Sequence, residues 1–395
     1  MNRPAIARER RIVVVSNVDM LYANGGVAYL SDALGRQGND VHLIAPHSEG
    51  SLKAVTDQWS FKVHAARPNG IFGMPRIRWL SFNYIARALL KELSPFDVAI
   101  FTNYMFISNA EYARRVSPST RLVHYALEFY RPGEHWPMSL VGGERQYRSV
   151  LSLFDLHIDV DKTRARLREL DFDISDTPLV LPNTVPLRRA VPTELDDRIE
   201  EIAKFDRKRD CPVLIYCGSN GRVGGIDVIL DALAEINRPF MFVAFLYEGE
   251  RTNSEVRRMA VEKVGSERVR IVDPISREKL TSVIGQADCA VSYYDSKVSA
   301  NFKYCAPSKV FEYIAAGLPI ISSSNPSMVD LIEGEGLGIC ALDDSAKGMR
   351  VAIERLLFNW VMQKQIRRRA ISVFDSSLCF EKASKGVIDA INNLA

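Results

Sequence analysis

The chain has 395 residues, which is more than one ordinary hydrophobic core uses and predicts about two to three domains. With 47% hydrophobic and 25% charged residues it has the composition of a globular protein, and its net charge of +3 is too small to indicate a nucleic-acid partner. Residues 12–15 are too short an apolar run for a signal peptide, and no run reaches the ~18 residues of a membrane-spanning helix, so we expect a cytoplasmic protein.

Short β-branched apolar runs alternate with helical segments along the whole chain. The predicted strands are residues 12–15, 41–44, 98–101, 122–125, 156–159, 213–216, 240–245, 269–272, 289–292 and 319–322. Near-continuous apolar strands separated by helices are typical of parallel sheets that helices cover on both faces. The pattern therefore predicts the doubly wound α/β class.

A proline-rich, charged stretch divides this pattern into two halves. Residues 182–212 contain four prolines around a charged segment, which indicates a linker between domains. We expect an N-terminal Rossmann-like domain at 1–190 and a C-terminal one at 191–375, facing each other across a cleft. A last helix at 376–395 is expected to pack back on the first domain.

Neither a metal site nor a disulfide framework is predicted. The six cysteines include no Cys-x-x-Cys pair, and Cys217 and Cys289 lie in or beside apolar runs, which suits reduced core residues. The six histidines form no zinc-binding pattern. We therefore expect no metal and no cofactor.

A Gly-Gly turn, Gly25-Gly26, follows the first predicted strand and opens a helix whose apolar positions include Val27, Leu30 and Leu34. Such a turn presents backbone N–H groups and the positive end of a helix dipole, which suits a diphosphate. A tight strand-to-helix turn without a ligand is the alternative.

The same arrangement recurs after the strand at 213–216. There Gly218 and Ser219 lead through a glycine-rich turn to Arg222 and then a helix at 226–236. The planar guanidinium of Arg222 can donate two hydrogen bonds to a phosphate. Alternatively, Arg222 is a solvated loop arginine.

The most specific motif covers residues 306–321. Pro307 suits the first turn of a helix, and Gly317 suits its end. Lys309 lies at an anion-binding helix start, and Glu312, three residues later, can accept hydrogen bonds from both ribose hydroxyls. A surface Lys–Glu pair is the alternative.

This motif resembles the donor-binding helix of GT-B glycosyltransferases, especially those of the retaining family 4. Further blocks are similar to that family at Gly25-Gly26 with its following helix, at 181–186 and at 278–288. The resemblance covers most of the chain. It implies a GT-B fold and a metal-independent, hexosyl-type transfer of a sugar from a nucleotide-sugar to an acceptor, with retention.

The resemblance also implies roles for individual residues. Glu312 matches the second acid of the family's Glu-x7-Glu motif, which binds the donor ribose, whereas Tyr304 stands where the first acid would be. Arg222 and Lys309 would meet the diphosphate. The loop with Pro274 and Ile275 would hold the base, and the remaining donor-site candidates are Gly218, Ser219, Ser308 and Val310.

Two residues of the strand near 122–130 are catalytic candidates. Glu128 aligns with an acid that the family places near the sugar and the acceptor, where a carboxylate could orient a hydroxyl or stabilise developing positive charge. His124 is the second candidate. Its alternative is a core histidine.

Residues 72–93 mix aromatic and basic side chains, among them Trp79, Tyr84, Arg87 and Lys91. Such a segment either contacts a membrane that carries a lipid-linked acceptor or forms an amphipathic helix on the core. The acceptor class stays open between a glycan, a lipid-linked sugar and a small molecule. Rival functions are a nucleotide-sugar epimerase of related fold and a catalytically degenerate sugar- or partner-binding protein.

Overall fold

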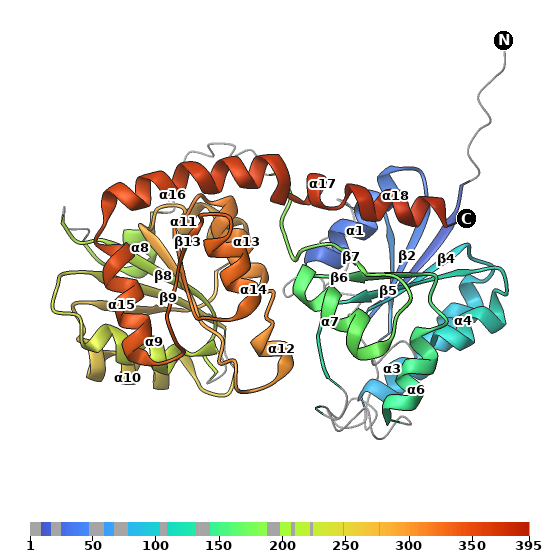
Figure 1. The fold of residues 1–395 in the computed structure, drawn as a ribbon, viewed down its shortest axis with the longest axis horizontal. Coiled ribbons are helices and arrows are strands. Elements are labelled where there is room, and N and C mark those ends of the chain that lie inside the picture. Colours follow the sequence, from blue (N-terminus) through green and yellow to red (C-terminus); the bar gives the residue numbers. More distant parts are fainter. Residues whose placement is uncertain are drawn as a thin grey trace, which may run out of the picture. The chain divides into compact units, whose positions relative to one another are not determined.

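The computed structural model describes residues 9–16, 25–46, 59–66, 78–102, 109–131, 134, 143–187, 198–206, 210–221, 224–247, 249–275 and 277–394. The chain forms two compact units. One consists of Met1–Asn183 with Ala383–Ala395, and the other of Thr184–Lys382. Each unit is built on one parallel sheet with helices between its strands (Figure 1).

Within its described residues the first unit forms a seven-stranded sheet in the order β3-β2-β1-β4-β5-β6-β7. The strands are β1 (Arg11–Val15), β2 (Asp40–Ala45), β3 (Lys62–Ala65), β4 (Val98–Thr102), β5 (Arg121–Ala126), β6 (Leu156–Asp159) and β7 (Leu179–Val180). The chain runs outward from β1 in one direction and then crosses to β4 and runs in the other, so the predicted doubly wound class is confirmed. The sequence reading missed β3 and β7, which are short, only partly buried strands at the two edges.

Helices cover both faces of this sheet. They are α1 (Gly25–Arg36), α3 (Arg78–Leu93), α4 (Ala110–Val116), α6 (Gly143–Leu151), α7 (Lys162–Phe172) and α18 (Lys385–Asn393). Apolar side chains of α3, α4 and α6 fill the core on one face, while α1 and α18 lie on the other (Figure 1). The C-terminal helix α18 contacts α1 and β7, and Asn392 bonds Gln37 beyond the end of α1.

The helix α3 covers most of the aromatic-basic segment. Phe82, Ala86 and Leu90 are buried in the core of the first unit. Tyr84 and Lys91 are exposed on the opposite side of the helix. In its described part the segment is therefore an amphipathic helix on the core, with an aromatic and basic outer face.

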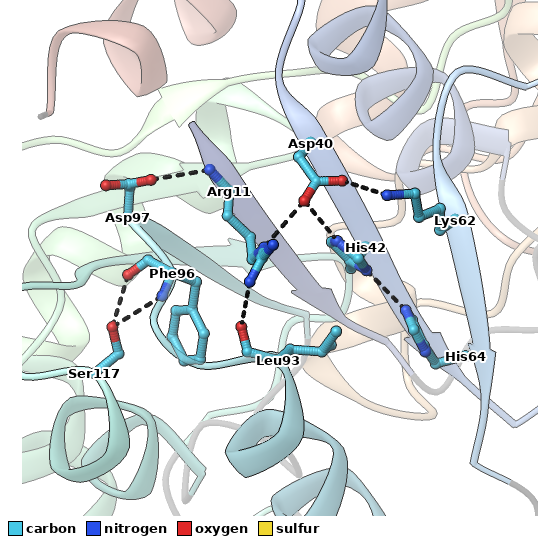
Figure 2. Close-up of polar contacts among 9 residues, drawn as sticks. All are labelled: Arg11, Asp40, His42, Lys62, His64, Leu93, Phe96, Asp97 and Ser117. Atoms are coloured by element: carbon cyan, nitrogen blue, oxygen red, sulfur yellow. Dashed lines mark hydrogen bonds and ion pairs between the residues drawn. The ribbon is translucent and has the colours of Figure 1, made fainter. Parts of the chain in front are cut away.

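Polar contacts tie together the amino ends of the first strands (Figure 2). Asp40, the first residue of β2, accepts hydrogen bonds from Arg11 Nε at 3.0 Å and from Lys62 Nζ at 2.7 Å. His42 Nε2 lies 3.0 Å from the same carboxylate, and His42 Nδ1 lies 2.8 Å from His64 Nε2. Burial would raise the pKa of Asp40, but the hydrogen bonds from Lys62, His42 and Arg11 outweigh it and hold that pKa well below its usual range. The charged side chains at the amino ends of these strands thus pair with one another. In doubly wound folds, ligands bind at the opposite edge of the sheet, where the strands have their carboxyl ends.

The described part of the second unit repeats the topology with six strands in the order β10-β9-β8-β11-β12-β13. They are β8 (Val213–Ser219), β9 (Met241–Tyr247), β10 (Val269–Val272), β11 (Cys289–Ser292), β12 (Ile320–Ser322) and β13 (Gly338–Cys340). All of their pairings are parallel. The strands predicted in this half are confirmed, and the short edge strand β13 was missed.

The helices of the second unit are α8 (Ile199–Ala203), α9 (Ile226–Ala234), α10 (Asn253–Val264), α11 (Arg277–Ile284), α12 (Ala300–Lys303), α13 (Ser308–Ala315), α14 (Pro326–Met328), α15 (Ala346–Leu357) and α16 (Trp360–Val373), with π-helical turns at Val329–Glu333 and Phe374–Leu378. The short helix α17 (Phe380–Ala383) follows at the boundary between the units. The chain forms two separate helices, α15 and α16, because the Asn359 side chain caps a new helix by accepting a hydrogen bond from the N–H of Met362.

Candidate functional site

The carboxyl edge of the second sheet carries a glycine-rich turn between β8 and α9. The last residue of β8, Ser219, accepts a hydrogen bond from the N–H of Gly221 through Oγ at 3.1 Å. Gly225 has a φ of +66°, and a Cβ atom there would lie 1.8 Å from the ring of Tyr293. Only glycine therefore fits where the chain enters α9. Arg222, the predicted phosphate ligand of this turn, lies outside the described residues.

The start of α13 lies at the same edge. Pro307 occupies the N-cap position in an extended conformation, so the helix begins at Ser308, as the sequence predicts. Val310 is buried in the core, whereas Lys309 is half-buried. A Cβ atom placed on Gly218 would lie 3.3 Å from Lys309 Nζ, so the ammonium sits directly over the glycine at the end of β8.

The ammonium of Lys309 lies between two aromatic rings. Its Nζ is 4.3 Å from the ring centre of Tyr216 and 4.8 Å from that of Tyr294, both within cation–π range. Within the described part of the chain, no hydrogen bond or ion pair engages this ammonium. Burial lowers the pKa of Lys309 to about 8 although the nearby Cys217 and Cys305 thiols raise it. An anion bound beside the Lys309 ammonium would supply a negative charge to balance it.

Glu312 lies one turn along α13, and its side chain is half-buried. Burial raises the pKa of the neighbouring Cys217 thiol to about 12, and the negative charge of Glu312 adds to that shift. The next residue, Tyr313, accepts a hydrogen bond from the N–H of Cys217 at 2.8 Å through its hydroxyl. This bond docks α13 against the carboxyl end of β8 and fixes where Glu312 and Lys309 stand.

The remaining donor-site candidates occupy other parts of the same unit. Tyr304 ends α12 and is half-buried, with the Lys303 ammonium 5.5 Å from its ring centre. Pro274 and Ile275 follow β10, the edge strand two places from β8. Because all strands are parallel, the segments that follow β8, β10 and β11 lie at one edge of the sheet. The structure thus places the described candidates of the second half on one edge of one sheet.

In the first unit, Glu128 follows β5 on a turn that two buried arginines hold. Its side chain is exposed, whereas its backbone carbonyl accepts a hydrogen bond from Arg168 Nη2 at 3.0 Å. Arg164 Nη1 donates to the carbonyl of Leu127 at 3.1 Å. Arg168 also forms a fully buried ion pair with Asp159 at 2.8 Å. Hydrogen bonds from two buried arginines therefore fix the backbone of the turn that carries the exposed Glu128 side chain.

The second catalytic candidate, His124, lies inside β5 and is fully buried. Its Nδ1 is 3.4 Å from Nδ1 of His157, its partner in the β5–β6 register, and its ring packs on Phe154. Burial and the charge of Arg168 lower the pKa of His124 well below its usual value. His124 is therefore a fully buried, neutral residue of the core in this structure, which favours the alternative of a core histidine.

The glycines of the first motif are placed as the sequence predicts. The helix α1 begins at Gly25, Gly26 is buried, and Val27, Leu30 and Leu34 face the core. Gly38, with a φ of +88°, lies in the turn between the end of α1 at Arg36 and the start of β2 at Asp40.

The described residues form neither a metal-binding cluster nor a membrane-spanning helix. In the described ranges, no three His, Cys, Asp or Glu side chains gather so that they could hold a metal ion. None of the helices in those ranges combines the length and apolar character needed to cross a membrane.

Sequence reasoning missed Tyr216 and Tyr294. Tyr216 stands in an apolar run and is fully buried, so it reads as an ordinary core residue. Tyr294 follows β11 without any motif. Only the tertiary structure brings both rings to Lys309.

Comparison with known proteins gives one family match. Residues 211–359 match the family model described as glycosyl transferases group 1. The sequence matches no curated protein.

Solved structures resemble the whole chain. The Anabaena protein HepE in complex with UDP-glucose is 12% identical, with a TM-score of 0.74 over 98% of this chain and 100% of its own. Sucrose-phosphate synthase from Thermosynechococcus elongatus is 16% identical, with a TM-score of 0.72 over 98% and 99%. A putative UDP-N-acetylglucosamine 2-epimerase from Listeria monocytogenes is 14% identical, with a TM-score of 0.61 over 97% and 96%. These likenesses show the fold, and they confirm the predicted GT-B architecture of two Rossmann-like domains.

Proposed function

We propose that this chain, which carries a glycosyl transferases group 1 domain at residues 211–359 within a GT-B fold, is a glycosyltransferase that uses a nucleotide-sugar donor. The observation that carries the proposal is the Lys309 ammonium at the start of α13, beside Gly218 and without an anionic partner among the described residues. A helix start with a cation and bare backbone N–H groups suits the diphosphate of a nucleotide-sugar. The complex of the Anabaena protein with UDP-glucose makes UDP the first nucleotide to test.

In this proposal each donor-site residue binds one part of the nucleotide-sugar. Lys309 and Arg222 bind the diphosphate, and Glu312 accepts hydrogen bonds from the ribose hydroxyls. The loop with Pro274 and Ile275 holds the base. Tyr304 offers the sugar an aromatic face and one hydroxyl where the family has a carboxylate.

Catalysis in this proposal depends on charge and position. The cations at the helix starts stabilise the negative charge that develops on the departing diphosphate. Holding donor and acceptor together removes much of the entropic barrier. Glu128 orients the acceptor hydroxyl or stabilises positive charge on the sugar ring, and transfer proceeds with retention and without a metal ion.

Two rival functions have specific support. The likeness to the Listeria epimerase supports a reaction that needs no acceptor. Tyr304 in place of an acid supports a protein that binds a sugar or a partner without turnover.

One assay separates the three functions. The protein is incubated with UDP-, GDP-, ADP- and dTDP-sugars, with and without a mixture of glycan and lipid-linked acceptors. Consumption of a donor only when acceptors are present supports the transferase. An isomerised donor without acceptor identifies an epimerase, and binding without any turnover identifies a binding protein.

We also propose that the outer face of α3 contacts the membrane that holds a lipid-linked acceptor. The exposed Tyr84 and Lys91 support this, because an aromatic and a basic side chain suit an anionic interface. Sedimentation with phosphatidylglycerol vesicles tests it. Equal sedimentation of wild type and a Tyr84→Ser/Lys91→Ser variant would contradict it.

A further inference from the structure

Tyr216 joins the two halves of the candidate phosphate site. Its hydroxyl lies 3.1 Å from the carbonyl oxygens of both Ser219 and Gly224, which are the two ends of the glycine-rich turn. The face of its ring lies under the Lys309 ammonium. One fully buried side chain therefore holds the turn closed and supports the cation beside it.

Tyr294 forms the second wall around the ammonium. Its backbone N–H donates to Ser323 Oγ at 2.9 Å, and its carbonyl accepts from Asn325 Nδ2 at 3.2 Å. Both partners are fully buried, and the Tyr294 ring stacks on Phe302 at 6.1 Å. The buried Ser323 and Asn325 thus hold the backbone of Tyr294, and Phe302 holds its ring. None of these three residues contacts the Lys309 ammonium through a hydrogen bond or ring contact.

These contacts make the surroundings of Lys309 unusual. A charge taken out of water is usually paired with an opposite charge, and a carboxylate beside Lys309 would compete with an incoming phosphate. Aromatic faces attract the ammonium through the ring quadrupole but cannot accept its proton or neutralise its charge. The cation therefore stays available to an anion while its position is restricted.

We infer that Tyr216 and Tyr294 are positioning residues of the donor site, which hold the Lys309 ammonium by their ring faces and so set the affinity for the donor diphosphate. The inference rests on the proposed function, because it takes the diphosphate of a nucleotide-sugar as the ligand of Lys309. It adds two residues that act through Lys309 rather than by touching the donor. The lowered pKa of Lys309 agrees with it, since burial removes the water that would stabilise the ammonium and a bound diphosphate would supply a compensating negative charge.

A double-mutant cycle between Tyr294 and Lys309 tests the inference. The probe is whichever of UDP, GDP, ADP and dTDP the wild type binds best, measured by calorimetry, with the corresponding nucleoside as the phosphate-free control. Tyr294→Leu, which keeps bulk but removes the ring face, should weaken diphosphate binding about 5- to 30-fold and leave nucleoside binding unchanged. Tyr294→Phe, the matched control, should bind as the wild type does.

The cycle is closed with Lys309→Met. If Tyr294 acts through the ammonium, the Tyr294→Leu change should have no further effect in the Lys309→Met background. Tyr216→Phe removes the hydroxyl but keeps the ring, so it should weaken diphosphate binding only about 2- to 12-fold by loosening the turn. Melting temperatures of all variants show whether each has folded.

The outcomes that overturn the inference differ from those that overturn the proposed function. Additive losses in the cycle, an equal loss of nucleoside binding, or a Tyr294→Phe variant as weak as Tyr294→Leu would each overturn the positioning role and leave the donor site intact. Lys309→Met binding as tightly as wild type would remove Lys309 from the site and the inference with it. A wild type that binds none of the four diphosphates would overturn the proposed donor class itself.

Discussion

Two side chains of opposite charge stand one helical turn apart at the start of α13, and each suits a different part of a nucleotide. Lys309 lies at the helix start between aromatic rings, and Glu312 is half-buried where Tyr313 docks the helix on β8. A diphosphate and a ribose are also adjacent in a nucleoside diphosphate. The three-residue spacing of Lys309 and Glu312 on this helix therefore fits both proposed contacts, with the diphosphate and with the ribose.

Replacing Glu312 with Ala should lower nucleoside diphosphate affinity at least tenfold. Hydrogen bonds to a charged group contribute about 1.5–3 kcal/mol each, and each ~1.4 kcal/mol is one decade in affinity. Calorimetry with the natural nucleotide and its 2′,3′-dideoxy analogue measures this. The wild type should lose affinity for the analogue, whereas Glu312→Ala should bind both equally. A variant that still prefers the natural nucleotide would show that another group binds the ribose.

The buried histidines predict a specific loss of stability in acid. Burial and the charge of Arg168 lower the pKa of His157 from 6.5 to about 4, so the folded protein binds this proton less readily than the unfolded chain. Above pH 6.5 the titration of His157 should not change the free energy of unfolding. As the pH drops from 6.5 toward 4, that free energy should fall by at most about 3 kcal/mol. His124 adds to the effect in the same direction.

His157→Gln, which cannot titrate, should flatten the dependence of melting temperature on pH in this window. The readout is the slope between pH 6.5 and 4, because the glutamine can change the overall level of stability. An unchanged slope would contradict the assignment of this proton to His157.

At the scale of elements, the entry into α9 shows how a helix start is fixed. Gly225 stands in the left-handed region, where a side chain would meet the ring of Tyr293. That ring is held in turn, because its hydroxyl donates to the carbonyl of Asp344 at 2.8 Å. The neighbouring glycine-rich turn is consequently shaped by packing against the loop before α15.

Gly225→Ala should destabilise the second unit by several kcal/mol, and Gly38→Ala is its matched control. Both glycines have a positive φ, which by itself costs an alanine about 1–2 kcal/mol. A Cβ atom on Gly38 meets no atom within 4 Å, whereas one on Gly225 collides with Tyr293. Chemical denaturation of both variants measures the difference. Equal losses would mean that the Tyr293 collision relaxes at no cost.

At the scale of the whole molecule, the proposed function assigns nucleotide-sugar binding to one unit and the candidate catalytic residue to the other. The described candidates for nucleotide binding lie in Thr184–Lys382, whereas Glu128 lies in Met1–Asn183. The two units repeat one strand order around β1 and β8. Each presents a glycine-led helix after its first strand, and the second also carries Lys309 at the start of α13 beside Gly218.

Glu128→Gln should therefore depress turnover about 100-fold or more while leaving nucleotide affinity and melting temperature near wild type. The side chain is exposed, and the backbone of its turn is held by Arg164 and Arg168, so the substitution leaves the support intact. Steady-state kinetics with the donor and acceptor identified by the nucleotide-sugar assay measures the effect. Retained turnover would remove Glu128 from the reaction centre.

The sequence by itself determined the fold class and the local geometry of the motifs. Apolar runs of four to six residues between helical segments predicted the parallel strands, because a strand buried on both faces must be apolar at successive positions. Pro307 and Gly317 bracketed α13 correctly, since proline favours a first helical turn and Gly317 adopts a φ of +71° that other residues avoid. The sequence did not predict the edge strands because β3 and β7 are only partly buried and because β7 and β13 have only two and three residues.

The tertiary structure alone decided which distant side chains meet. His124 contacts His157, its partner in the β5–β6 register. His42 contacts His64, which lies two residues after Lys62, the register partner of His42, and so on the same face of the sheet. Tyr216 and Tyr294 reach Lys309 for a similar reason, since β8, β11 and the start of α13 share one edge of the sheet. The hydrophobic pattern of a segment reflects only its own secondary structure and burial. The order of the strands in the sheet depends instead on how the connections between segments cross over. A cation held by one ring from β8 and another from the segment after β11 therefore leaves no pattern in the sequence.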